Sequence, residues 1–237
     1  MDKSKNARIF LKIAAICSFL GALTTALLIF LPNPEAPDFE SRVSLFENSR
    51  YMTKLWILFL HPQLNLIASL GVAYVLLKKY TWQIILGTLF LLVWSLTEMS
   101  QQALLIDTLN QIWRPAYAAA EGEVEKTAYE TLIRAANGIS DSKYFLVIYG
   151  FGLGSLLFGL AFIREQSLAR WIGWALIFIG LLSLASFGRY YLGLGFLDSP
   201  VNFSYKFIYP YLQPLVRIAI GLWIFKIISN HNTSEAA

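Results

Sequence analysis

The chain is poor in the side chains that most catalytic and cross-linking chemistry needs. Its 237 residues include one cysteine, two histidines and only 14% charged residues. A single Cys17 excludes an internal disulfide and a cysteine metal site. A catalytic zinc site needs about three His, Cys or carboxylate ligands, and one of the two histidines, His231, lies in a polar tail. We therefore expect no metal and no other cofactor, and an enzymatic function is not favoured.

Apolar residues make up 57% of the chain and are gathered in long blocks. A helix needs about 20 apolar residues to cross the hydrocarbon core of a bilayer, and helices satisfy their backbone groups internally. Six blocks meet this condition, which predicts an all-α, polytopic membrane bundle in one domain over residues 1–237. The predicted spans are 9–31, 55–77, 82–106, 144–163, 171–196 and 207–228.

The charges between these spans predict the orientation of the bundle. Nine Lys and Arg residues lie on the short segments of one side, together with three acidic residues. Eight cations and eleven acidic residues lie on the longer segments of the other side. Because short cytoplasmic segments carry the excess of cations, both termini are predicted to be cytoplasmic. The net charge of +4 follows from this bias and does not indicate nucleic-acid binding.

Two long segments, 32–54 and 107–143, are predicted on the outer side. The first contains three prolines and alternating charges, and we expect it to be mostly irregular. The second has apolar residues at steps of three and four from Tyr117 to Ala135, with Asn137-Gly138 as a helix stop. This pattern predicts an amphipathic helix across the outer mouth of the bundle, or a solvated connector.

Four ionisable residues, His61, Glu98, Arg189 and Arg217, lie within the predicted spans. A charge at the bilayer centre costs about 3 kcal/mol, so such residues mark candidate functional sites. All four fall in the outer half of the membrane, which predicts one polar cavity open to the outer side. With polar neighbours on the same helical faces, the candidate ligand-binding or buried polar cluster is His61, Asn65, Glu98, Gln101, Gln102, Arg189, Tyr190, Gln213 and Arg217.

This cluster allows three interpretations. Glu98 pairs with Arg189 or Arg217 as a structural ion pair, or Glu98 and His61 carry protons. In the third, one of the two arginines binds an anionic ligand, because one glutamate cannot neutralise both. A guanidinium binds carboxylates and phosphates bidentately, so this interpretation predicts that the protein binds or transports a small anionic or lipidic ligand.

Small residues in the spans predict close helix packing within the chain or, alternatively, a homo-oligomer interface. They include Gly150, Gly154, Ser155 and Gly159 in the fourth span and Gly173 and Gly180 in the fifth. Ala22 and Ala26 have the same spacing in the first span.

Three segments carry a resemblance to a known family: YGFGLGSLLFGLAF, REQSLAR and WIGWALIFIGLL. Through the order of these segments, the chain resembles a family of six-span bacterial membrane proteins classed as a domain of unknown function. The resemblance implies a location in the bacterial cytoplasmic membrane and offers no catalytic residues. The six spans and Ala22-xxx-Ala26 also look like the substrate-binding subunits of energy-coupling vitamin importers. That resemblance implies a partner membrane subunit, although the long segment 107–143 departs from it. The rival interpretation is a structural or accessory membrane subunit.

Overall fold

The structure is a computed structural model that describes residues 3–235, all of whose long elements are helices. Six of them are long and apolar enough to cross a membrane. They are α1 (Lys3–Phe30), α3 (Ser49–Leu76), α4 (Thr81–Ala103), α6 (Glu123–Phe162), α7 (Leu168–Tyr191) and α9 (Tyr209–Glu235). The predicted all-α architecture with six apolar helices is confirmed, and the chain is a multi-pass membrane protein by helix length and composition.

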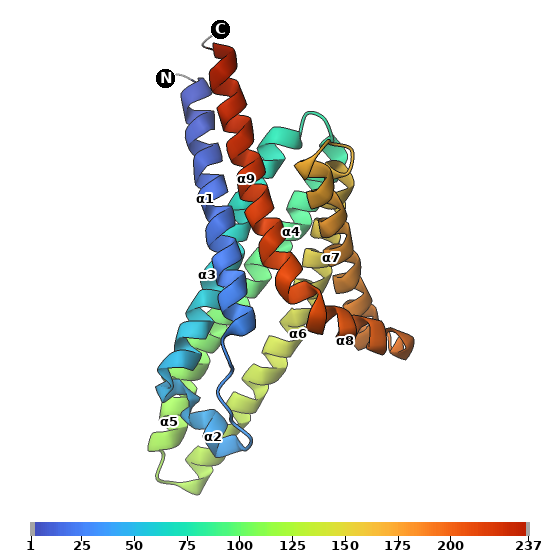
Figure 1. Ribbon diagram of the computed structural model, residues 1–237. Helices are drawn as coiled ribbons and strands as arrows, with labels where there is room; N and C mark the ends of the chain where they lie inside the picture. The colour runs from blue at the N-terminus through green and yellow to red at the C-terminus, as the bar shows by residue number, and fades with distance from the viewer. Residues whose placement is uncertain (1–2, 236–237) are drawn as a thin grey trace.

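The six long helices form a closed ring (Figure 1). Following the ring, α1 packs on α3, α3 on α4, α4 on α6, α6 on α7, α7 on α9, and α9 returns to α1. The two ends of the described chain lie together at one end of the ring. A ring of helices encloses a central space, and each helix presents one narrow face to it. This arrangement places the polar residues of six different helices around one axis.

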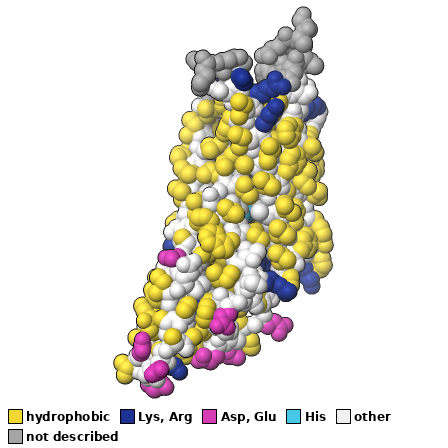
Figure 2. Space-filling model, turned by 90° about the vertical axis from the view of Figure 1, so that its left-hand side faces the viewer, with side chains coloured by type: hydrophobic (Ala, Val, Ile, Leu, Met, Phe, Trp, Pro, Cys, Tyr) yellow, Lys and Arg dark blue, Asp and Glu magenta, His cyan; other side chains and the backbone are white. Residues whose placement is uncertain are grey.

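The outer surface of the ring is apolar. Large side chains such as Leu23, Trp174 and Leu181 are exposed, each with more than half of its surface accessible. Figure 2 shows this hydrophobic band between a basic end, near the termini, and acidic side chains at the opposite end. Exposed apolar side chains around a whole bundle are expected where lipid is the solvent. The surface therefore matches a bilayer, with its charges divided between the two ends.

Close contact between α6 and α7 depends on small residues. A Cβ on Gly159 would lie 2.9 Å from the carbonyl oxygen of Gly173, and one on Gly180 would lie 2.7 Å from the backbone nitrogen of Leu156. A Cβ on Gly150 would lie 2.9 Å from the carbonyl oxygen of Phe90 on α4. These small residues pack helices of the same chain against one another, as the first of the two sequence-based interpretations stated.

The segment 107–143 does not fold as predicted. The third span continues beyond α4 through the π-helix η2 (Leu104–Trp113) and α5 (Arg114–Ala119), and the fourth begins at Glu123 and runs unbroken to Phe162. The expected helix across the mouth is thus a helical hairpin that extends two spans along their own axes (Figure 1). Asn137-Gly138 ends no helix, because the backbone there makes ordinary helical hydrogen bonds.

The hairpin has a small core of its own, made with the segment after α1. Its buried residues are Val43, Leu109, Tyr117, Ile133 and Ala136. The segment 32–54, predicted to be mostly irregular, contains α2 (Phe39–Val43), the 3₁₀-helix η1 (Ser44–Glu47) and the first turn of α3.

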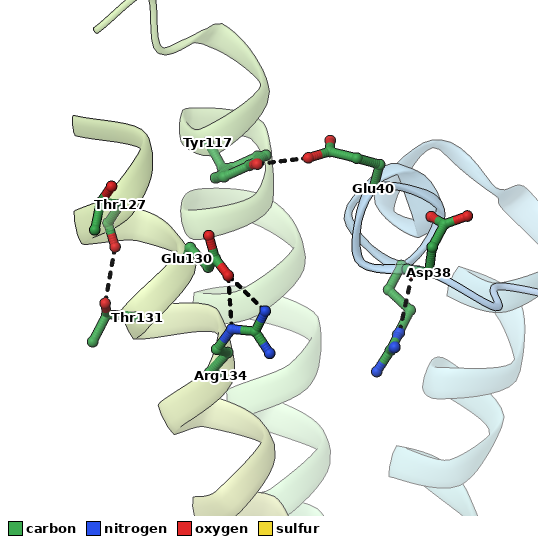
Figure 3. A network of polar contacts seen from close by, with 8 residues as sticks. Asp38, Glu40, Tyr117, Thr127, Glu130, Thr131 and Arg134 are labelled. Carbon is green, nitrogen blue, oxygen red and sulfur yellow. Dashed lines mark hydrogen bonds and ion pairs between the residues drawn. The ribbon is translucent and has the colours of Figure 1, made fainter. Parts of the chain in front are cut away.

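Polar contacts join this segment to the hairpin. Tyr117 donates a hydrogen bond of 2.7 Å to Glu40, whereas the ion pair of Arg134 with Glu130, at 2.6 Å, lies within α6 (Figure 3). The Arg134 guanidinium also lies over the Phe39 ring, 4.9 Å from its centroid. Apolar packing supported by these bonds explains why the chain folds here instead of forming a free loop.

The fifth span is shorter than the predicted 171–196. Helix α7 ends at Tyr191, and a 3₁₀-turn η3 (Gly195–Leu197) leads into α8 (Asp198–Phe207). The chain turns at Gly193, whose φ of +68° is a left-handed conformation that glycine adopts without strain. Helix α8 therefore packs against α7 and α9 (Figure 1).

Candidate functional site

Two cavities lie inside the ring, one above the other along its axis. The outer cavity, nearer to the hairpin, has a volume of about 310 Å³, and the inner cavity has about 60 Å³. All six long helices contribute to both, and α8 adds Tyr205 to the outer one. Trp94, Phe151 and Gln213 line both cavities and so form the partition between them.

Glu98 lines the outer cavity. The side chain of Trp94, one turn earlier on α4, lies beside its carboxylate, and the charge of Arg217 acts on it electrostatically. The ion pairs of the described residues include neither Glu98 nor Arg217, so the two charges face each other across the partition without direct contact. Glu98 therefore faces the outer cavity without an ion-pair partner among the described residues.

Arg217 lines the inner cavity, one helical turn beyond Gln213 on α9. Its Nε is buried and has no hydrogen-bond partner. Its carbonyl oxygen accepts a 2.6 Å hydrogen bond from the Ser18 hydroxyl, which attaches α9 to α1 at this level. A buried guanidinium nitrogen without an acceptor is costly, since buried polar groups are ordinarily paired. An anion or an acceptor oxygen in the inner cavity would supply the missing partner.

His61 is buried, with 6% of its surface exposed, and both of its ring nitrogens are used. Nδ1 lies 2.8 Å from the Thr24 hydroxyl, and Nε2 lies 3.1 Å from Asn65 Nδ2. Thr24 donates its own proton to a backbone carbonyl of α1, so it accepts from Nδ1–H. Nε2 then accepts from Asn65, which gives a neutral imidazole that joins α1 to α3.

Replacing Thr24 by valine should destabilise the protein by about 1 to 3 kcal/mol, because it leaves the buried Nδ1–H of His61 without an acceptor. The measurement is the midpoint of thermal unfolding in detergent. Thr131, whose hydroxyl bonds only to the Thr127 carbonyl on an exposed helix face, is the matched control. Equal effects of Thr24→Val and Thr131→Val would show that the His61 contact contributes nothing.

Arg189 does not share the cavity with Glu98, contrary to the sequence-based prediction. It donates a hydrogen bond of 2.5 Å to Asn202 and lies 3.6 Å from the Asp198 carboxylate, both on α8. Its guanidinium also lies over the ring of Tyr190, which is exposed at the rim. The partners come from α8, a helix that the sequence pattern did not reveal.

The two remaining glutamines of the predicted cluster also lie outside both cavities. Gln101 donates to the carbonyl and the hydroxyl of Ser140 at 3.0 and 2.8 Å, which ties α4 to α6. Gln102 is buried and its Oε1 has no hydrogen-bond partner. The structure thus brings together His61, Asn65, Glu98, Gln213 and Arg217 around the two cavities, and it does not bring Gln101, Gln102, Arg189 or Tyr190 into them.

Other lining residues were missed by sequence reasoning. Tyr144 and Tyr205 line the outer cavity with Thr25 and Ser183. Tyrosines at span ends look like ordinary interfacial residues, and no periodic signal distinguishes those that face inward. Arg114, buried in the hairpin at 4% exposure, was also missed: it bonds to Asn110 at 2.6 Å and lies over the Tyr51 ring.

Within the described residues, no group of three or more His, Cys, Asp or Glu side chains could hold a metal ion. The cavity instead combines one carboxylate, one guanidinium, amides and hydroxyls with apolar walls. No family model, curated protein or solved structure matches this chain.

Proposed function

We propose that this protein binds a small anionic or lipidic ligand in the cavities of the helical ring, with Arg217 as the residue that meets the anionic group. The observation that carries the proposal is the buried Nε of Arg217, which lines a cavity and has no hydrogen-bond partner. Arg189 is neutralised by α8, so Arg217 is the intramembrane arginine whose charge no ion pair in the described chain offsets.

The walls of the outer cavity support a ligand with an apolar part. Leu28, Ile29 and Leu58 line one region of it, and Val147 and Ile148 line another. Small-molecule sites commonly measure 300–1,000 Å³ and combine such apolar walls with a few polar groups. The outer cavity lies at the lower end of this range, which favours a compact ligand whose polar group reaches toward Gln213 and Arg217.

The side of entry is part of the same proposal. The basic end of the bundle is taken as cytoplasmic by the charge rule applied to the sequence, and a bacterial cytoplasmic membrane is what the family resemblance implies. The outer cavity then faces away from the cytoplasm, beneath α8 and the helical hairpin. Binding from this side is compatible with a receptor-like role or with the first step of transport.

Short-chain carboxylates should stabilise the purified protein against thermal unfolding more than their neutral amides do. In the Arg217→Gln variant the affinity for the carboxylates should fall at least tenfold, because a charge-assisted hydrogen bond contributes about 1.5 to 3 kcal/mol. The measurement is a concentration series of thermal-unfolding midpoints. Lys206→Gln, which removes a cation from α8 outside the cavities, is the control and should bind as the unmodified chain does.

An equal response of Arg217→Gln and the unmodified chain to every carboxylate would contradict the proposal. The competing function is that of a structural or accessory membrane subunit. It is favoured by His61 and Arg189, whose polar groups already have partners within the chain. The charge-exchange experiment described in the Discussion separates these two functions.

A further inference from the structure

A polar pocket separate from the two central cavities lies at the end of the ring that carries the termini. It has a volume of about 370 Å³ and lies between the α3–α4 turn, the α6–α7 link and the last turns of α9. Its charged lining residues are Lys79, Arg164, Glu165 and Lys226, and Ser167 and Trp223 complete two of its walls. Three cations and one carboxylate give the lining a surplus of two positive charges.

The one carboxylate of the pocket is already committed. Glu165 accepts 2.6 and 2.7 Å hydrogen bonds from Lys79 and from the Tyr80 hydroxyl. Burial alone would raise the pKa of Glu165, but these two bonds outweigh it and hold the pKa below its ordinary value. Within the described residues, Arg164 and Lys226 take part in no ion pair. The surplus of positive charge therefore belongs to these two side chains.

The start of α7 adds hydrogen-bond donors to the same pocket. No side chain caps this helix, and its first turn closes only with the bond from Trp171 N to the Ser167 carbonyl. Leu168 and Ala169 are residues of the pocket lining, and their amides therefore have no partner in the helix. Free amides and the helix dipole favour an anion at such a position.

Tryptophans beside the pocket indicate its depth in the membrane. Trp82 and Trp171 begin α4 and α7 next to the two linking segments, and they are 56% and 44% exposed. Exposed tryptophans at span ends lie at the level of lipid headgroups. A basic pocket between helices at this level is suited to an anionic headgroup more than to a freely diffusing ion.

We propose that this pocket binds the phosphate of an anionic lipid headgroup, with Arg164, Lys226 and the first amides of α7 as its ligands. Apolar residues beside it, such as Leu168 and Ile227, would contact the first part of the acyl chains. The site lies at the other end of the ring from Glu98 and Arg217. It therefore stands or fails independently of the ligand proposed for the central cavities.

The test uses the full-length protein in a neutral maltoside detergent, titrated with phosphatidylglycerol, with phosphatidylcholine or with inorganic phosphate. Lipid binding is measured by native mass spectrometry and by the midpoint of thermal unfolding. The variants are Arg164→Gln, Lys226→Gln and their combination. Lys78→Gln is the matched control, because Lys78 is exposed on the same turn as Lys79 and does not line the pocket.

We expect phosphatidylglycerol to bind and stabilise the protein more than phosphatidylcholine does. Each single variant should weaken phosphatidylglycerol binding about fivefold and the combination about 25-fold, with no change in Lys78→Gln. Stabilisation by phosphatidylglycerol but not by inorganic phosphate identifies a lipid; stabilisation by both identifies a phosphate site that needs no acyl chain. Binding that is weakened equally by Lys78→Gln, or not weakened by the double variant, would overturn the proposal.

Discussion

Replacing Gly180 by alanine should prevent the protein from reaching its native packing. A Cβ at this position would lie 2.7 Å from the backbone nitrogen of Leu156 and 2.8 Å from the carbonyl oxygen of Gly152. Both atoms belong to the backbone of α6, so no side chain can rotate away, and the two helices must separate. Overpacking ordinarily costs about 1 to 3 kcal/mol, and a backbone obstacle places this substitution at the upper end or above.

The measurement is the yield of monodisperse protein in detergent together with its unfolding midpoint. Gly138→Ala is the matched control, because Gly138 also lies within a helix but a Cβ there meets no atom within 4 Å. Alanine is the better helix former by about 0.5 to 1 kcal/mol, so the control should be slightly more stable than the unmodified chain. Similar behaviour of the two variants would mean that α6 and α7 do not approach as closely as described.

Glu98→Arg should be the most damaging single charge change in the ring. It places a cation in the outer cavity, across the partition from Arg217, and the linings of the two cavities contain no other acid to pair with either. Leaving a buried charge uncompensated costs about 3 to 5 kcal/mol. We expect loss of folded protein, or a large fall in the unfolding midpoint, whereas Glu98→Gln keeps the shape of the side chain and should be tolerated.

The exchanged pair Glu98→Arg with Arg217→Glu separates the two functions considered above. If the charges serve only to balance one another, the exchange should restore the stability of the protein, and its response to carboxylates should equal that of the unmodified chain. If Arg217 meets a ligand, the exchange should restore folding while the affinity for carboxylates stays at least tenfold lower, because the guanidinium has moved to the other cavity. A fully stable exchanged protein with an unchanged carboxylate response would contradict the ligand-binding role of Arg217, and an exchanged protein that stays as unstable as Glu98→Arg would contradict the structural function.

The span assignments could be predicted because lipid imposes a simple requirement. Each span must satisfy its backbone internally and present apolar side chains over about 20 residues, and both features are visible in the order of residues. The hairpin was missed for a related reason. Leu109, Tyr117 and Ile133 bury one face against the segment around Val43, and the sequence contains no local sign of which distant segment covers an amphipathic face.

The candidate site was predicted only in part. Glu98, His61 and Arg217 stood out because ionisable residues are rare in spans. The partners of Arg189 could not be recognised in the same way. They are Asp198 and Asn202, which belong to a helix that begins only after the turn at Gly193. Two arginines that looked equivalent along the chain differ in three dimensions: one is neutralised at the rim, and the other lies inside without a partner for its Nε.

The sequence by itself determined the class of this protein, its six apolar helices and the division of charge between its ends. These are properties of segments, set by the cost of burying polar groups in lipid. Only the tertiary structure decided that the helices close into a ring, that Trp94, Phe151 and Gln213 divide its interior into two cavities, and which charges remain unpaired. The reason is that rotation of each helix about its axis depends on contacts between residues far apart in the chain.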